Sequence, residues 1–402
     1  MGMTRRPLLG VGAVTLAVTI ALGYALGSTV VPPSLDASAT PSGAITSDPT
    51  ARPIPGHEVF GFVPYWEMVG GIADDVARTD LTTLALFSVT HTKAGAIDTG
   101  QTGYKRITGD IGTRLIREAH DRGVAVQLVY TSFGTARNQT FFTSPTVQDA
   151  TIAALVTLAA RIGVDGIDVD VEQLGDDLVP AYGVFVGRLR DALRTAIPDG
   201  RVSAATASGL TGAAMALAAS NAGADRIFLM AYDYHYAGSD VGASAPLARR
   251  DGAPQDLGWS LDLYASVGVP VQETILGLPL YGMRWRVAGP ELGAPRLGDG
   301  AIWVPADNPN FLASPPSPPQ FDPLEVVEFY AVAPTVSPVP GDSRATAGWQ
   351  AIYVDSPETL APKLALADDR GLAGAGFWAI GYVRGLAGYK ELISRFGAGQ
   401  LH

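Results

Sequence analysis

Apolar and charged residues alternate most regularly in the stretch Asp165-Gly-Ile-Asp-Val-Asp-Val-Glu172. Successive side chains of a β-strand point to opposite faces, so Asp168, Asp170 and Glu172 share one face and the intervening apolar residues share the other. An apolar outer face is typical of a barrel strand that packs against helices. Consecutive acids on this face lie about 6.6 Å apart along the strand, near enough to shift each other's titration. A solvated edge strand would not normally carry so regular an apolar face, so we interpret the acids as a catalytic group.

Similar apolar runs, each followed by a helical pattern, recur along the rest of the chain. Eight such units predict the α/β class, and specifically a (β/α)8 TIM barrel with parallel strands inside and helices outside. An open doubly wound sheet is the alternative, but no glycine-rich phosphate loop follows the first strand. The predicted strands are Val59 to Trp66, Leu84 to His91, Val124 to Thr131, Gly166 to Glu172, Val202 to Ala207, Arg226 to Tyr232, Thr274 to Tyr281 and Gly376 to Tyr382. The predicted helices include Gly112 to Arg122, Thr146 to Ile162, Val179 to Ile197 and Pro357 to Arg370.

One connection is too long to be a simple loop. Residues 283–356 separate the seventh strand from the helix at Pro357, and structureless loops of that length are rare in compact domains. The aromatic residues and the proline-rich centre of this stretch predict a small α+β insertion. In a barrel, an insertion after a strand lies on the catalytic face, where it would wall one side of a cleft. Its aromatic residues are Trp285, Trp303, Trp349, Tyr330 and Phe321.

The N-terminus has the pattern of a targeting segment, in which an uncharged run at residues 8–31 follows Arg5 and Arg6. The run is long enough to anchor the chain in a membrane, yet Thr4-Arg-Arg-Pro-Leu-Leu9 looks like a twin-arginine export signal that would be cleaved. Both alternatives predict that residues 1–31 direct the protein to an extracellular or cell-surface location. Residues 32–56, rich in Pro, Ser, Thr and Ala, are typical of an extended linker. The barrel domain is predicted at residues 57–402, with the insertion inside it.

The composition of the chain excludes several classes of partner and of catalytic site. The net charge of −11 argues against a nucleic-acid partner, because phosphates are bound by Lys and Arg. The chain has no cysteine, which excludes disulfides, thiolate metal sites and a cysteine nucleophile. Its histidines and acids do not have the spacing of a metal site, so we expect neither a metal nor a cofactor. We expect the protein to act as a monomer.

The acidic strand resembles the D-G-x-D-x-D-x-E signature of family 18 glycoside hydrolases, the chitinase-like (β/α)8 barrels. Met230-Ala-Tyr-Asp233 is similar to the family's M-x-Y-D, and Gly277-Leu-Pro-Leu-Tyr-Gly282 resembles the end of its seventh strand. Gly376-Phe-Trp378 is similar to the eighth strand with its tryptophan, and the insertion falls where chitinases carry theirs. Gly61-Phe-Val-Pro-Tyr-Trp66, together with Gly371-Leu-Ala-Gly-Ala-Gly-Phe-Trp-Ala-Ile-Gly381, looks closest to the bacterial branch that includes spore-cortex and peptidoglycan-acting glucosaminidases.

This resemblance implies a retaining glycosidase without an enzyme nucleophile, acting on polysaccharides that contain N-acetylglucosamine, such as chitin or peptidoglycan. Glu172 would protonate the glycosidic oxygen and later activate water. The substrate's own acetamide would attack the anomeric carbon to form an oxazolinium ion. Asp170 would hold the acetamide N–H, and Asp168 would share a proton with Asp170. Tyr232 would donate a hydrogen bond to the acetamide oxygen.

The resemblance also implies substrate-binding residues at the barrel mouth. Trp378 would form the floor beneath the sugar, because the apolar face of a pyranose stacks on an aromatic ring, with core packing as the alternative. His235 would either contact substrate or cap a loop. Strand alternation places Met230 and Tyr232 on one face and sends Asp233 to the other unless the strand ends there. The further substrate-binding candidates are Asp233, Met230, Tyr65, Trp66 and Tyr281, for which core or rim packing is again the alternative.

Two stretches stand apart from the family pattern. The third strand ends in Tyr130-Thr-Ser-Phe-Gly134, where chitinases usually show Ser-x-Gly-Gly, and this difference would change the rim of the cleft and leave the acids in place. Asn138-Gln-Thr140 is a formal glycosylation triplet. A glycan-binding lectin on the same barrel is the alternative function. Lectins of this family replace the acid, however, and here the acidic strand is intact.

Overall fold

The computed structural model describes residues 57–334 and 348–401. The predicted export segment and linker, residues 1–56, lie outside the described residues, so export and anchoring stay predictions. Within the described ranges, no helix has the length and apolar composition needed to cross a membrane.

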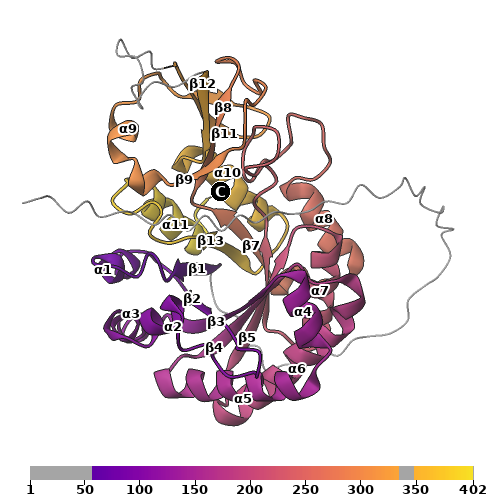
Figure 1. Cartoon of the computed structure of the whole chain (residues 1–402). Helices are drawn as coiled ribbons and strands as arrows, with labels where there is room; N and C mark the ends of the chain where they lie inside the picture. Colours follow the sequence, from indigo (N-terminus) through magenta and orange to yellow (C-terminus); the bar gives the residue numbers. More distant parts are fainter. Residues whose placement is uncertain (1–56, 335–347, 402) are drawn as a thin grey trace, which may run out of the picture. The chain divides into compact units, whose positions relative to one another are not determined.

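Parallel strands close into a barrel in the order β1-β13-β7-β6-β5-β4-β3-β2, with helices around the outside (Figure 1). The last strand, β13, pairs with both β7 and β1 and so completes the ring. The predicted (β/α)8 TIM barrel is therefore confirmed. The barrel strands are β1 (Glu58–Pro64), β2 (Thr83–Val89), β3 (Ala125–Phe133), β4 (Gly166–Glu172), β5 (Arg201–Ala207), β6 (Arg226–Met230), β7 (Thr274–Pro279) and β13 (Gly374–Trp378).

The helices begin and end at residues with clear local signals. For example, α5 has a proline in its first turn and stops at Gly163, whose φ of 77° is costly for other residues. A capping box between Ser356 and Thr359 starts α10. The helices are α1 (Ile72–Ala77), α2 (Thr102–Ile107), α3 (Asp110–His120), α4 (Thr135–Phe142), α5 (Pro145–Ile162), α6 (Val179–Ala196), α7 (Leu210–Asn221), α8 (Leu257–Val267), α9 (Pro309–Ala313), α10 (Pro357–Asp369) and α11 (Tyr389–Gly397), with 3₁₀ turns η1 (Asp176–Leu178), η2 (Val271–Glu273) and η3 (Pro305–Asp307).

The barrel interior is filled by side chains. Phe60, Phe62 and Phe228 are at most 2 % exposed, and their ring centroids lie 4.8–5.6 Å apart. A Cβ at Gly277 would lie 2.4 Å from the Phe228 ring, so the neighbouring strand β7 needs a glycine at this point. Because the interior is packed, a ligand is confined to the mouth at the carboxyl ends of the strands.

The chain between β7 and α10 forms a second, antiparallel sheet in the order β10-β11-β12-β8-β9. This sheet confirms the predicted insertion after the seventh strand. Trp285 and Tyr353 are buried, while Trp303 and Tyr330 form a separate small core against which residues of α9 pack. Phe321, in contrast, is 56 % exposed. The strands are β8 (Gly282–Val287), β9 (Ala301–Trp303), β10 (Gln320–Asp322), β11 (Val327–Val332) and β12 (Trp349–Val354).

The long segment between β6 and α8 forms hydrogen bonds to the insertion. Arg250 donates two hydrogen bonds to Asp322, at 2.8 and 2.5 Å. Glu325 is 1 % exposed and accepts the backbone N–H groups of Ala243 and Arg250, at 2.6 and 3.0 Å. These charge-assisted bonds hold the insertion against the segment that leaves the carboxyl end of β6.

Candidate active site

The row of acids lies on the inner face of β4, whose bounds coincide with the predicted strand. Asp168 and Asp170 are buried, at 0 % and 4 % exposure, while Glu172 is half-buried at the carboxyl end of the strand. Alternation along β4 therefore sets the three carboxyls at increasing height, from the packed interior to the mouth.

Asp168 belongs to a hydrogen-bonded group in the barrel interior. The hydroxyl Oγ of Ser203, on β5, lies 2.5 Å from both Asp168 Oδ1 and Gln127 Oε1. A serine hydroxyl has a single proton, so it can donate to only one of these oxygens. In the other contact the Ser203 oxygen must therefore accept a hydrogen bond. The donor is either a protonated Asp168 or the side-chain amide nitrogen of Gln127, turned toward Ser203.

Burial raises the pKa of all three carboxyls of the row. The pKa of Asp168 rises to about 7 because the group is desolvated, although the Ser203 hydrogen bond opposes the rise. Desolvation, then the charges of Glu172 and Asp168, raise the pKa of Asp170 well above its ordinary value. Asp168 Oδ2 and Asp170 Oδ1 are buried without a hydrogen-bond partner among the described residues. Buried, unpaired carboxyl oxygens favour the protonated form, so this row holds protons near neutral pH.

The uppermost acid, Glu172, lies close enough to the carboxyl of Asp233 for the two charges to interact. Desolvation, and then the charge of Asp233, raise the pKa of Glu172 to about 7. Glu172 is consequently protonated over much of the range below neutral pH, as a general acid must be.

Asp233 reaches the site because β6 ends at Met230, two residues before the predicted end. The backbone of Asp233 then turns to a φ of 60°, which breaks the alternation that would have sent its side chain outward. The Asp233 N–H donates to Ser244 Oγ at 3.0 Å, and the Tyr281 hydroxyl donates to Asp233 Oδ1 at 2.5 Å. Asp233 is thus held inside the mouth by residues from two different loops.

Tyr232 lies among the same carboxyls. Desolvation, followed by the charges of Asp170, Asp233 and Glu172, raises the Tyr232 pKa well above its ordinary value. Its ring centroid lies 6.2 Å from that of Tyr281. With a raised pKa, the Tyr232 hydroxyl keeps its proton and remains a hydrogen-bond donor at any physiological pH.

Aromatic rings form the opposite part of the mouth, around Trp378 at the end of β13. Phe62 and Phe87 pack against the Trp378 ring at centroid distances of 5.6 and 4.8 Å, and Trp66 lies at 6.1 Å. Trp66 is 39 % exposed and donates a hydrogen bond through Nε1 to the Tyr382 hydroxyl at 3.1 Å. Tyr65, Met230, Tyr232 and Trp378 all pack on the apolar cluster that fills the barrel interior.

The structure therefore brings nine of the ten predicted site residues together at one mouth, with Asp168 beneath them in the barrel interior. It also adds several residues that the sequence did not indicate. Phe133 is 38 % exposed and pairs in register with Glu172 across β3 and β4. Its ring stacks on Phe87 at 6.4 Å. The stretch around Phe133 had been noticed only as a departure from the family pattern, because strand register is not visible in a single sequence. The sequence analysis also did not indicate five other residues of the site: Ser203, Gln127, Ser244, Phe87 and Tyr382.

His235 does not line the mouth. It is fully buried, with Nδ1 2.9 Å from the Asp240 carbonyl and Nε2 3.4 Å from Glu325 Oε1 of the insertion. Of the two roles expected for His235, the structure supports the loop contact rather than the substrate contact. Among the residues that the structure describes, no group of three or more His, Asp or Glu side chains is arranged to hold a metal ion.

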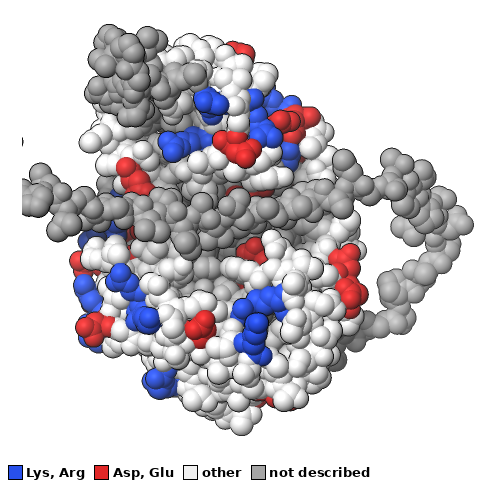
Figure 2. Space-filling model, viewed as in Figure 1, with Lys and Arg blue, Asp and Glu red and all other residues white. Residues whose placement is uncertain are grey.

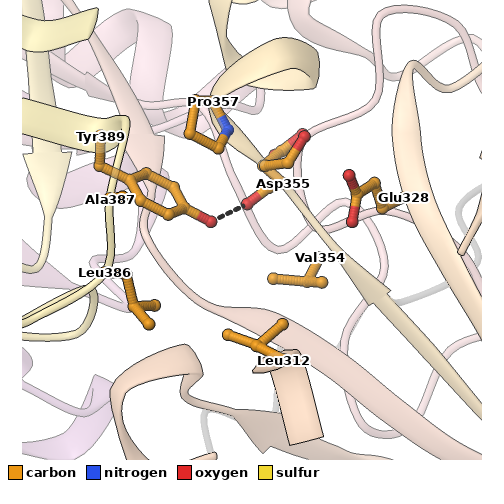
Figure 3. Close-up of a pocket in the computed structure, with 9 residues that line it drawn as sticks. Leu312, Glu328, Val354, Asp355, Pro357, Leu386, Ala387 and Tyr389 are labelled. Carbon is orange, nitrogen blue, oxygen red and sulfur yellow. Dashed lines mark hydrogen bonds between the residues drawn. The ribbon is translucent and has the colours of Figure 1, made fainter. Parts of the chain in front are cut away.

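A cavity of about 200 Å³ lies elsewhere, between the insertion and the start of α10 and α11 (Figure 3). None of the predicted site residues lines it. Its polar groups are already paired: Tyr389 donates to the Asp355 carbonyl at 2.6 Å, and Lys363 donates to both Asp355 carboxylate oxygens at 2.6 and 2.8 Å. The Glu328 carboxylate accepts from the Tyr330 hydroxyl at 2.7 Å. We assign this cavity no part in the chemistry at the mouth.

Asp168→Asn is expected to raise the free energy of unfolding at pH 8 by on the order of 2–4 kcal/mol. The folded pKa of Asp168 is about 7 against an ordinary 3.8. Stability contributed by this group is therefore fully present below about pH 4 and is lost as the pH rises through about 7. Asparagine has no charge to bury, so the variant escapes that loss.

Urea unfolding of both proteins at pH 4 and pH 8 measures the effect. Exposed Asp199→Asn is the control, and the same Asp168→Asn effect at both pH values would contradict the prediction.

Known proteins are similar to this chain over much of its described length. The model of the family described as glycosyl hydrolases family 18 matches residues 65–382. Chitotriosidase-1 of Mus musculus is 27 % identical over 198 residues, which are 42 % of this chain and 41 % of that protein. A probable endochitinase of Caenorhabditis elegans is 28 % identical over 267 residues, 62 % of this chain and 42 % of that protein. The matches thus span about two fifths of the length of these relatives.

Solved structures share the fold at lower identity. A chitinase from Cycas revoluta in complex with (GlcNAc)3 has a TM-score of 0.68 at 18 % identity, covering 86 % of this chain and 100 % of that one. A chitinase-like agglutinin from Robinia pseudoacacia has a TM-score of 0.69 at 19 % identity, covering 84 % and 98 %. The spore cortex-lytic enzyme SleL of Bacillus cereus has a TM-score of 0.65 at 17 % identity, covering 85 % and 74 %. Because the family model matches most of the chain, this protein belongs to glycosyl hydrolase family 18.

Proposed function

We propose that the protein is a retaining glycoside hydrolase that cleaves β-1,4-linked glycans containing N-acetylglucosamine, with the substrate's acetamide as nucleophile. The observation that carries the proposal is the position of Glu172 at the carboxyl end of β4, above the buried Asp168 and Asp170. Desolvation there raises its pKa to about 7, so that it is mostly protonated below neutral pH. Glu172 donates this proton to the glycosidic oxygen as the bond to the anomeric carbon breaks. The acetamide oxygen attacks that carbon and forms an oxazolinium ion. Glu172, now ionised, takes a proton from a water molecule as that water attacks the anomeric carbon. The attack opens the oxazolinium ring and leaves the anomeric configuration retained overall.

Asp170 supports the charged intermediate. It lies on the inner face two residues before Glu172, and its Oδ1 is buried without a protein partner among the described residues. That oxygen is available to accept the acetamide N–H, and an ionised Asp170 stabilises the positive oxazolinium. Asp168, with its own raised pKa, shares one proton with Asp170, and that proton moves to Asp168 as Asp170 ionises. Tyr232 donates its hydroxyl proton to the acetamide oxygen and orients it for attack.

The aromatic side of the mouth supplies the binding surface. Trp378 is half-buried at the end of β13 and has Phe87 and Trp66 beside it. We propose that its exposed part lies under the sugar at the cleavage point, with Tyr65 and Trp66 at a neighbouring sugar. Asp233 and Tyr281 contact sugar hydroxyls from the opposite side, where they are already hydrogen-bonded to each other.

The charge distribution argues against a nucleic acid as the partner. The carboxyls of Asp170, Glu172 and Asp233 lie at the mouth, with that of Asp168 beneath them. On the face in Figure 2, basic side chains of the described residues are scattered among acidic ones. A nucleic acid needs contiguous basic side chains. Chitin and peptidoglycan both carry the acetamide that the reaction needs, so both are substrates to test.

The experiment measures reducing ends released by the purified full-length chain from chitooligosaccharides and, in parallel, from peptidoglycan. Proton NMR of the first product supplies the stereochemistry, and we expect the β-anomer first because attack by the acetamide is followed by attack by water. An α-anomer as first product would mean inversion and would exclude the oxazolinium route. Binding of (GlcNAc)3 without release of reducing ends from either polymer would instead favour the lectin alternative.

A further inference from the structure

The chain is held unevenly at the point where Glu172 leaves the sheet. On the side of β5, pairing with β4 stops at Asp170, which lies opposite Ala205. On the side of β3, pairing continues to Glu172, which lies opposite Phe133. The next residue, Gln173, has a φ of 61°, so the backbone turns sharply away after Glu172. The last residue of β4 is thus anchored from one neighbour only.

That anchor is a pair of hydrogen bonds to the backbone carbonyl of Glu172. Asn138 donates to it through Nδ2 at 2.6 Å, and the Gly134 N–H donates to it at 3.3 Å. Gly134 has a φ of 101° and is the residue immediately before α4. A residue with a Cβ would be strained in that conformation, so the loop that carries this donor depends on glycine.

The side-chain amide of Asn138 is buried and is hydrogen-bonded through both its nitrogen and its oxygen. Asn138 is 0 % exposed, and its Oδ1 accepts a hydrogen bond at 2.7 Å from Ser132 Oγ, which is itself 0 % exposed. The amide therefore joins the end of β3 to the end of β4. Its burial also means that the Asn138-Gln-Thr140 triplet offers no accessible acceptor for a glycan in the folded chain.

We propose that Asn138 is a positioning residue for the general acid, acting through the Glu172 backbone carbonyl to set the height and direction of the Glu172 carboxyl at the mouth. This inference rests on the proposed function, because it assigns Asn138 to the acid of that reaction. Glu172 has no paired residue on β5, so loss of the amide lets the end of β4 shift with its carboxyl. A displacement of about 1 Å at a reacting group costs on the order of 10²-fold in rate.

A misplaced acid has a signature that simple destabilisation lacks. Cleavage of a sugar–sugar bond needs full protonation of a poor leaving group, whereas departure of a dinitrophenolate needs almost none. We expect Asn138→Ala to lower kcat/KM for chitotetraose by about 10–10²-fold and for the dinitrophenyl β-glycoside of diacetylchitobiose by less than about 3-fold. The ratio kcat/KM isolates the first irreversible step, in which Glu172 acts as acid.

Gln148→Ala is the matched control. Gln148 is 4 % exposed, and its side-chain amide donates to the carbonyls of Phe141 and Phe142, both at 3.2 Å, at the far end of the same helix α4. Both variants remove a buried amide that bonds backbone carbonyls, but only Asn138 contacts Glu172. We expect similar falls in Tm and a Gln148→Ala rate within about 3-fold of wild type on both substrates.

Asn138→Leu keeps the branched shape of the side chain without its hydrogen bonds, and it repeats the test if the alanine variant does not fold. Equal losses on the two substrates, or no loss on chitotetraose, would overturn the positioning role while leaving the proposed function intact. Failure of the wild type to cleave these two substrates and peptidoglycan would overturn the proposed function, and the positioning role with it.

Discussion

Glu172→Gln is expected to lower kcat/KM for chitooligosaccharides by about 10²–10⁴-fold, because it removes the proton donor and keeps the shape of the side chain. The side chain is half-buried at the end of β4, so the change should leave Tm almost unaltered. Steady-state kinetics of the two purified proteins measure the loss. Affinity for (GlcNAc)3, measured by calorimetry, should change by less than about 3-fold, since in the proposed mechanism the sugar rests on Trp378 and not on the acid.

The pH dependence supplies an independent check on Glu172. Wild-type kcat/KM should fall as the pH rises through about 7, where Glu172 loses its proton. The residual activity of Glu172→Gln should lack this alkaline limb. Glu67→Gln is the matched control, because burial also raises the pKa of Glu67 near the rim and no step uses that group. An alkaline limb that persists in Glu172→Gln would assign the acid to another residue.

Asp170→Asn is expected to lower kcat by about 10²–10³-fold, because asparagine still accepts the acetamide N–H but carries no negative charge to stabilise the oxazolinium ion. The loss should therefore appear in the transition state and not in substrate binding. Steady-state kcat and KM should separate the two, with KM within about 3-fold of wild type.

A bicyclic inhibitor that mimics the oxazolinium ion sharpens this test. Its affinity for Asp170→Asn should fall by about as much as kcat, since such an inhibitor resembles the charged intermediate. Asp168→Asn is the companion variant. Because Asp168 lies one step deeper and is bonded to Ser203, its effect on inhibitor affinity should be smaller. Equal losses of inhibitor affinity in the two variants would contradict the different roles proposed for Asp170 and Asp168.

Strong local patterns made much of the fold predictable. The fourth strand was predicted with the bounds that β4 has, because alternating acids and apolar residues leave only one register for a strand with a packed outer face. The insertion was predicted from a connection too long for a loop, and the structure has an antiparallel sheet there. These features depend on neighbours in sequence, which a single chain displays.

The position of Asp233 in the site could not be predicted from local sequence patterns. Alternation placed it on the wrong face unless β6 ended early, and the early end depends on Ser244 and Tyr281, which are distant in sequence. Phe133 is a second case, since its place beside Glu172 follows from the register between β3 and β4. Asn138 is a third: its sequence reads as a glycosylation triplet, yet its side chain bonds the carbonyl of Glu172.

By itself, the sequence determined the barrel class, the insertion, and the shared face of Asp168, Asp170 and Glu172, because alternation along a strand dictates which side chains meet. Only the tertiary structure decided how those acids are buried and paired, and hence which way their pKa values move. It also decided which side chains surround them, because barrel closure brings together strand ends that are far apart in the chain. The physical reason is that desolvation and strand register arise from contacts between distant segments, which no local pattern encodes.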